Sequence, residues 1–315
     1  MSETRKISIL IPCYNEESNI AALYTAVKDM LNKELSSYNY EIIFIDNFST
    51  DTTRSLIREI CNRDKNVKAI FNIRNFGSVN SSYYGLCQTS GECAILLYAD
   101  FQEPIELIPI FVNEWKKGYK LVIGIKHKSK ENLIKRLMRT LYYKLLKKMS
   151  EDVEQIEHFD GFGLYDKSFI GILKTLRDPK PYIKSIVAEF GANQKHIFYT
   201  QQKRRNGKSH ISWYKLYDDA MLTFTTYTKI VPRIAVIIGF IVSFFSFLLG
   251  VSYLAIKLIY WDLFEMGQAP VIIGMFFLGS LQLFFLGFLS EYVISINSRV
   301  MNQPLVIEEE RINFN

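Results

Sequence analysis

The stretch LLYADFQEP, residues 96–104, places a carboxylate and an amide two positions apart directly after an apolar run. Asp100 and Gln102 both offer oxygen, the ligand atom that Mg²⁺ and Mn²⁺ prefer. A metal bound with a nucleotide diphosphate takes one or two protein oxygens and fills its other positions with phosphate oxygens and water. These two side chains therefore suffice as metal ligands. The alternative is that they only cap the helix that follows Pro104.

A second acidic motif ends another apolar run. Asp46 closes the stretch YEIIFID, and Asp51 follows in the sequence NFSTD. A carboxylate at a strand exit can accept hydrogen bonds from ribose hydroxyls or from a base N–H, so we interpret Asp46 as a nucleotide ligand. Asp51 better fits the first turn of the next helix, where the helix dipole favours negative charge.

A basic run, KRRNGKS at residues 203–209, carries the charge that phosphate groups need. Arg204, Arg205 and Lys208 can compensate the charge of a bound phosphate. The alternative is that they anchor the chain to anionic lipids, and the two roles are compatible. The four cysteines and four histidines show no metal-ligand spacing, so we expect oxygen atoms to hold any metal.

The elements between these motifs predict how they are positioned. Short β-branched runs alternate with helical stretches in the first half of the chain, which is typical of an open α/β sheet, mostly parallel and covered on both faces. We predict strands at 7–13, 40–46, 67–73, 93–99, 120–126 and 196–202, and helices near 17–34, 51–63, 79–89 and 105–117. Ligands bind outside the carboxyl ends of such strands, so the motifs PCYNEE, DNFSTD, RNFG and ADFQEP should meet on one rim.

The C-terminal third differs in composition. Residues 234–256 and 266–290 carry no charge, and each run is long enough, at about 1.5 Å per residue, to cross roughly 30 Å of hydrocarbon. We therefore predict a domain over 1–210, an amphipathic juxtamembrane segment over 211–233, two transmembrane helices over these runs, and a solvated tail over 291–315. The alternatives are that the two runs are buried core helices and that the amphipathic segment packs on the domain.

Charge and flanking residues predict the orientation. The chain of 315 residues has a formal net charge of +6 and 49% hydrophobic residues, which excludes a disordered chain. Basic residues flank the two apolar runs more densely than they occur in the link between them, which places both ends in the cytoplasm. The N-terminus shows no apolar segment ending in a cleavage site, so it gives no sign of export. We expect a multi-pass protein of the cell (inner) membrane with its first domain in the cytoplasm.

Six motifs, in order and followed by the two apolar runs, carry a family resemblance: ILIPCYNEESNI, IDNFSTDTT, NIRNFGS, LLYADFQEP, GFGLYD and RRNGKS. Over essentially its whole length the chain resembles the inverting family 2 glycosyltransferases of the polyprenyl-phosphate type. The resemblance implies a GT-A fold, a Rossmann-like α/β sheet that binds a nucleotide sugar, with UDP-hexose expected. The sugar would pass to a polyprenyl (undecaprenyl) phosphate, with Mg²⁺ or Mn²⁺ as cofactor. No nucleic-acid partner is expected, and a homo-oligomer is left open.

The resemblance also implies roles for individual residues. The metal would be held by Asp100 and Gln102, and the catalytic set would be Asp100, Asp160 and Arg204. The remaining contacts would be to the nucleotide, from Pro12, Tyr14, Glu16, Asp46, Arg74 and Asn75, and to the acceptor phosphate, from Arg204, Arg205, Lys208 and Ser209.

Four positions depart from the family pattern. The second motif has Asn47 where a second acid is usual and Phe48 where glycine is usual. In the fourth motif Tyr98 stands where the first acid is usual, and Asp160 is displaced by one position. Two alternatives stay open, and Asn47, Phe48 and Tyr98 motivate the second. The chain could act on another lipid-linked or glycan acceptor, or it could be a non-catalytic membrane partner of another transferase.

Overall fold

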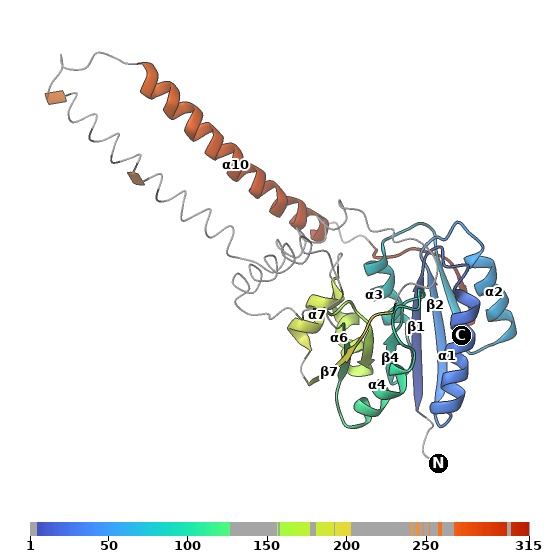
Figure 1. Ribbon diagram of the computed structural model, residues 1–315. Coiled ribbons are helices and arrows are strands. Elements are labelled where there is room, and N and C mark those ends of the chain that lie inside the picture. The colour runs from blue at the N-terminus through green and yellow to red at the C-terminus, as the bar shows by residue number, and fades with distance from the viewer. Residues whose placement is uncertain are drawn as a thin grey trace. The chain divides into compact units, whose positions relative to one another are not determined.

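The computed structural model describes residues 5–126, 156, 158–176, 181–191, 193–202, 268–300 and 304–314, with scattered positions between 241 and 259 (Figure 1). The chain divides into two compact units. One comprises residues 1–144, 152–210 and 302–315, and the other comprises residues 145–151 and 211–301. Each unit is described by itself.

The first unit is built on an eight-stranded sheet with the order β7-β5-β6-β4-β1-β2-β3-β8. Its strands are β1 (Lys6–Cys13), β2 (Asn39–Asp46), β3 (Val67–Asn72), β4 (Cys93–Leu96), β5 (Leu121–Lys126), β6 (Gly163–Asp166), β7 (Gln194–Tyr199) and β8 (Glu308–Ile312). The strands β1 to β4 are parallel, as are β5 and β7. Because β6 runs antiparallel to both β4 and β5, those two point the same way. This confirms the predicted Rossmann-like sheet of the GT-A class, mixed and mostly parallel.

Helices cover both faces of the sheet because its strands bury side chains on both sides. Ile9 and Ile11 of β1 belong to one apolar cluster, and Leu10 between them belongs to a second. The first cluster includes residues of α1 (Ile20–Glu34), α2 (Thr53–Arg63) and α4 (Leu107–Lys116). The second includes residues of α3 (Ser78–Gln88), α6 (Lys167–Thr175) and α7 (Ile183–Phe190). The alternation of side chains along each strand sends neighbouring residues into opposite cores.

Two predictions about extended segments are wrong. The stretch 158–168, where the sequence predicted no strand, contains β6, which lies between β4 and β5. The C-terminal end, predicted to be a solvated tail, contains β8, which pairs antiparallel with β3. The Asn313 side chain then donates to the carbonyls of Cys61 (2.8 Å) and Val67 (2.7 Å), so the C-terminus lies beside α2 and β3 (Figure 1).

The described part of the second unit contains α10 (Gln268–Val300), a helix of 33 residues that includes most of the predicted span over 266–290. Among the described residues, no helix combines the length and apolar character needed to cross a membrane. The other predicted span, over 234–256, and the juxtamembrane segment, over 211–233, fall wholly or largely outside the described residues. Both spans therefore stay predictions.

Candidate active site

The strand exits meet at one edge of the sheet. β1, β2, β3, β4, β5 and β7 all point the same way, so their carboxyl ends share this edge. β6 runs in the opposite direction, and its amino end, preceded by Asp160, therefore lies at the same edge. The edge collects segments that are far apart in the sequence, as the pattern of strands predicted.

The loops after β1 and β2 are bonded to each other. Asn15, which has φ of +55°, donates its backbone N–H to Ser49 Oγ (2.8 Å) and accepts the Thr50 N–H with its side-chain oxygen (2.8 Å). Asp51 accepts the N–H of Thr53 at 3.0 Å, which supports its interpretation as a residue at the start of a helix. These bonds hold the two loops as one surface.

Three of the six residues predicted to contact the nucleotide are buried. Pro12 lies within β1. The buried carboxylate of Glu16 accepts a hydrogen bond from the side-chain amide of Asn19 at 2.6 Å. Asp46 has no exposed surface, and burial raises the pKa of its carboxyl. It accepts the Ser49 N–H at 3.1 Å and lies 3.3 Å from Arg54 Nε. In this structure Asp46 holds its own loop, and its contact with a nucleotide stays a prediction.

The other three, Tyr14, Arg74 and Asn75, have solvent-exposed surface. Asn75 Oδ1 accepts from the side-chain amide of Asn47 (2.8 Å) and from the N–H of Gly77 (2.9 Å). Asn47, which is buried, in turn accepts from the Asn72 amide (3.1 Å). The residue that replaces the usual second acid is therefore the centre of a polar network joining the exits of β2 and β3.

The predicted metal ligands lie in the loop after β4. Asp100 Oδ1 accepts the N–H of Gln102 at 3.2 Å, which leaves Oδ2 for a ligand. The side-chain oxygen of Gln102 accepts from the Gln201 amide at 2.7 Å, which orients it and leaves it a second lone pair. The described residues contain no group of three or more His, Cys, Asp or Glu side chains that could hold a metal. Two oxygens are enough for a metal that takes its other ligands from a diphosphate and water, so Asp100 and Gln102 fit such an ion.

Asp160 lies in a group of charged and aromatic side chains beside this loop. It forms an ion pair with Lys126, whose Nζ also lies 3.9 Å from Glu103 Oε1. The Tyr98 hydroxyl donates to the backbone carbonyl of Asp160 at 2.7 Å. Tyr98, which replaces the usual acid of the fourth motif, therefore fixes the loop that carries Asp160.

Glu103 is buried at 3% exposure among these groups. Burial, together with the charges of Asp160 and Asp100, raises the pKa of its carboxyl to about 8, although Lys126 acts in the opposite direction. Asp100 and Asp160 add negative potential at this buried carboxyl. A cation at this edge would be attracted electrostatically.

The sequence-based prediction missed three residues of this group: Lys126, Glu103 and Gln201. A polar side chain at the end of an apolar strand was the available signal for Lys126. Gln201 had no such signal, because its contact with Gln102 spans 99 residues of sequence. Arg204, Arg205, Lys208 and Ser209 lie outside the described residues, so their predicted roles stay predictions.

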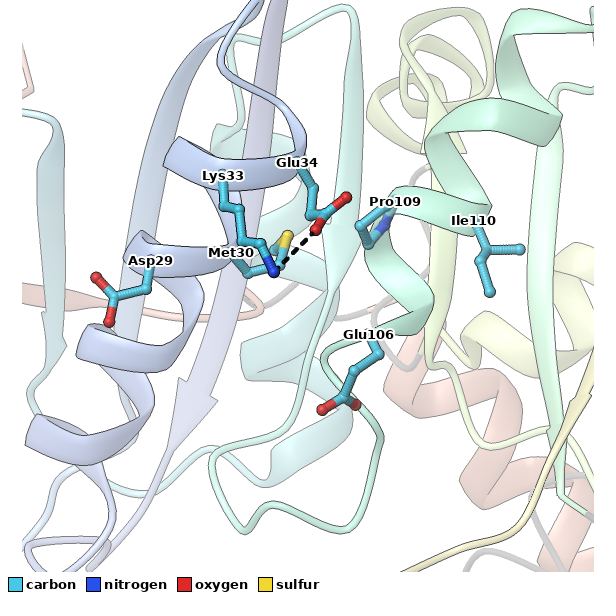
Figure 2. Close-up of a pocket in the computed structure, with 7 residues that line it drawn as sticks. All are labelled: Asp29, Met30, Lys33, Glu34, Glu106, Pro109 and Ile110. Carbon is cyan, nitrogen blue, oxygen red and sulfur yellow. Dashed lines mark ion pairs between the residues drawn. The ribbon is translucent and has the colours of Figure 1, made fainter.

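A separate cavity of about 470 Å³ lies between α1 and α4. Figure 2 shows its lining residues: Asp29, Met30, Lys33, Glu34, Glu106, Pro109 and Ile110. None of the predicted site residues is among them. The polar groups at the strand exits, and not this cavity, form the candidate site.

Comparisons with known proteins agree with this geometry. The family described as "Glycosyl transferase family 2" matches residues 8–172. The chain is 30% identical over 303 residues to the bactoprenol glucosyl transferase of Shigella phage SfII, covering 96% of this chain and 97% of that protein. It is 28% identical over 289 residues to the prophage bactoprenol glucosyl transferase homolog of Escherichia coli (strain K12), covering 91% and 93%.

Glucosyl-3-phosphoglycerate synthase from Mycobacterium tuberculosis is 17% identical, with a TM-score of 0.49 over 70% of this chain and 78% of that one. The family match extends from β1 into α6 and therefore includes the predicted metal ligands and Asp160. The chain belongs to glycosyl transferase family 2 and is a glycosyltransferase.

Proposed function

We propose that this glycosyltransferase moves a hexose from a nucleotide diphosphate, UDP in the first instance, to a polyprenyl phosphate at the cytoplasmic face of a membrane. One observation carries the proposal: the exits of β4 and β5 bring Asp100, Gln102 and Lys126 to one edge, beside the loops of β1 to β3. Oxygen ligands and a cation at one edge suit a reaction in which phosphate groups face each other.

The donor would lie along the exits of β1, β2 and β3, with Tyr14, Arg74 and Asn75 on its side of the loops. A divalent metal held by Asp100 and Gln102 would neutralise charge on the leaving diphosphate. Gln201 supports this arrangement because it orients the side chain of Gln102. The bonds between the β1 and β2 loops give the donor a preformed surface.

The acceptor side follows from the chemistry of a phosphate monoester. Its second pKa is near 6, so its oxygen is largely ionised at pH 7 and needs little help from a general base. That oxygen would attack the anomeric carbon as the bond to the diphosphate breaks. The nucleoside diphosphate leaves with the bonding electrons, and the configuration at the carbon is inverted. Lys126, Arg204, Arg205 and Lys208, with Ser209 as a hydroxyl donor, would bind the acceptor phosphate.

The lipid acceptor and the membrane are proposed from three observations. Relatives that match nearly the whole chain carry the name bactoprenol glucosyl transferase. That name specifies a polyprenyl lipid and a glucosyl group. The uncharged runs at 234–256 and 266–290 are long enough to span a bilayer. Apolar side chains along α10, such as Val271 and Met275, have 63% and 70% of their surface exposed in the protein alone. Lipid could cover such side chains.

The test uses membranes from cells that express the full chain, supplied with Mn²⁺, polyprenyl phosphate and a panel of radiolabelled UDP- and GDP-sugars. We expect organic-phase label with one donor and a loss of about a hundredfold or more in Asp100→Asn, because the substitution weakens a metal ligand. The matched control is Asp29→Asn, which removes a carboxylate that lines the cavity between α1 and α4. Absence of lipid label with every donor, from folded and membrane-bound protein, would favour another acceptor or a non-catalytic partner.

A further inference from the structure

Phe48 follows β2 in a conformation that is unusual for its type. Its φ is +71°, in the left-handed region where a bulky L residue is strained. The neighbours Asn47 and Ser49 are buried at 4% and 6% exposure, whereas Phe48 is 39% exposed. Strained residues persist where the surrounding structure fixes them, and they gather at ligand sites. Phe48 therefore merits a functional explanation.

The loop on both sides of Phe48 is fixed by hydrogen bonds. The Asn47 N–H donates to the Cys13 carbonyl (3.0 Å), and the Ser49 N–H donates to Asp46 (3.1 Å). Ser49 Oγ also accepts the N–H of Asn15 (2.8 Å). The chain is thus held before and after Phe48, and the aromatic side chain stays partly in solvent at the edge where the strands exit.

Arg54 lies against this ring and is itself held from two strands. Its guanidinium carbon is 6.0 Å from the centroid of the Phe48 ring, within the range of a cation–π contact. Arg54 pairs with Asp46 at the end of β2 (3.3 Å) and with Glu309 of β8 (2.6 Å). The C-terminal strand therefore contributes to the position of a side chain that contacts the loop after β2.

We propose that the face of Phe48 stacks on the nucleobase of the sugar donor, and that Arg54 is a positioning residue that holds the ring. The proposal rests on the proposed function, which places a nucleotide at these strand exits. Phe48 lies between the loop of Tyr14 and the loop of Arg74, since β2 lies between β1 and β3. An aromatic ring offers a base a stacking surface whatever the identity of the base. Phe48, at the position where the family usually has glycine, would then affect donor affinity.

The test measures binding to the purified full chain by calorimetry, with UDP and with pyrophosphate, each in the presence of Mn²⁺. Pyrophosphate carries the phosphates but no base. Phe48→Gly removes the ring and relieves the strain at φ +71°, because glycine adopts that conformation freely. We expect UDP binding about 5- to 150-fold weaker and pyrophosphate binding unchanged.

Two further variants of exposed phenylalanines control for other effects. Phe48→Leu keeps an apolar side chain but loses the aromatic face, so it should also bind UDP less tightly. This variant separates loss of the ring from any loosening of the loop that glycine causes. Phe190→Leu changes a phenylalanine with 41% exposure at the end of α7 and should bind UDP as the unaltered chain does. Unchanged UDP affinity in both Phe48 variants, or equal losses for UDP and pyrophosphate, would overturn the base contact.

The role of Arg54 has its own readout. Arg54→Lys keeps a cation beside Asp46 but loses the flat group that lies against Phe48. We expect the KM for the donor to rise while kcat stays unchanged, whereas a purely structural role would lower the amount of folded enzyme and leave KM unaltered. An unaltered KM overturns the positioning role. If the unaltered chain binds no nucleoside diphosphate and transfers no sugar, the proposed function fails instead.

Discussion

Replacing Glu41 of β2 should lower the free energy of unfolding of this domain by a measurable amount. Its side chain is 1% exposed and lies at the amino end of the sheet, opposite the candidate site. Lys6 and Lys68 each lie 2.9 Å from Oε2, and the Ser8 hydroxyl donates to Oε1 at 2.6 Å. Burial alone would raise the pKa of this carboxyl, but the hydrogen bonds from Lys68, Ser8, Ser90 and Lys6 outweigh it and lower the pKa to about 2.

The magnitude and its pH dependence follow from that pKa. A fall in the pKa of Glu41 from 4.5 to about 2 on folding corresponds to about 3 kcal/mol of folding free energy at neutral pH. Because the pKa is lower in the folded state, this stabilisation is fully present above pH 4.5 or so and is lost as the pH falls toward 2. We expect Glu41→Gln to lower the free energy of unfolding by about 3 kcal/mol at pH 7, since the charge partner of two lysines is removed.

The change in free energy of unfolding is measured by urea unfolding of the full chain. Trp213 and Trp261 are replaced so that the fluorescence comes from Trp115 alone. Glu34→Gln is the matched control, because Glu34 is 49% exposed and pairs with Lys33 at 3.6 Å, a contact worth less than about 1 kcal/mol. The difference in free energy of unfolding between the unaltered chain and Glu41→Gln should become smaller from pH 5 downward. A loss below about 1 kcal/mol, or a gap that is constant with pH, would refute the reasoning.

Three further predictions concern the site and its supports. Asn47→Ala should cost about 1–3 kcal/mol in urea unfolding, because it leaves the buried Asn72 amide with only the longer contact, 3.4 Å, to Ser81 Oγ. Gly163→Ala should destabilise by about 1–3 kcal/mol, since a Cβ would lie 2.7 Å from the Val122 carbonyl oxygen, whereas Gly171→Ala on α6 meets nothing within 4 Å and should not destabilise. Glu309→Gln should raise the donor KM in steady-state assays, because it releases Arg54. Glu310→Gln releases Arg58 and should leave the donor KM unchanged.

The local pattern of the sequence was enough to predict the parallel part of the sheet. The apolar runs that became β1, β2, β3 and β5 begin and end within about one residue of their predicted bounds. Such runs are recognisable because a strand buried on both faces requires continuous apolar side chains. The same rule placed Asp46 and Asp100 at one edge of the sheet, since the exits of parallel strands coincide.

The antiparallel strands could not be predicted in the same way. GLYD and EEERI are short, and neither shows the continuous apolar run of a doubly covered strand. β6 forms because its backbone pairs with β4 and β5, and β8 forms because its backbone pairs with β3. These pairings join segments up to about 240 residues apart, which no local periodicity records.

The sequence by itself determined the family, the order of the parallel strands along the chain and the candidate metal ligands, because each depends on a short motif or a local alternation. The tertiary structure decided which groups support the candidate site. Gln201 orients Gln102, Lys126 pairs with Asp160, and β8 brings Glu309 to Arg54. Each of these contacts depends on the pairing of distant strands, and that pairing is fixed by packing and backbone hydrogen bonding across the whole sheet rather than by the residues next in sequence.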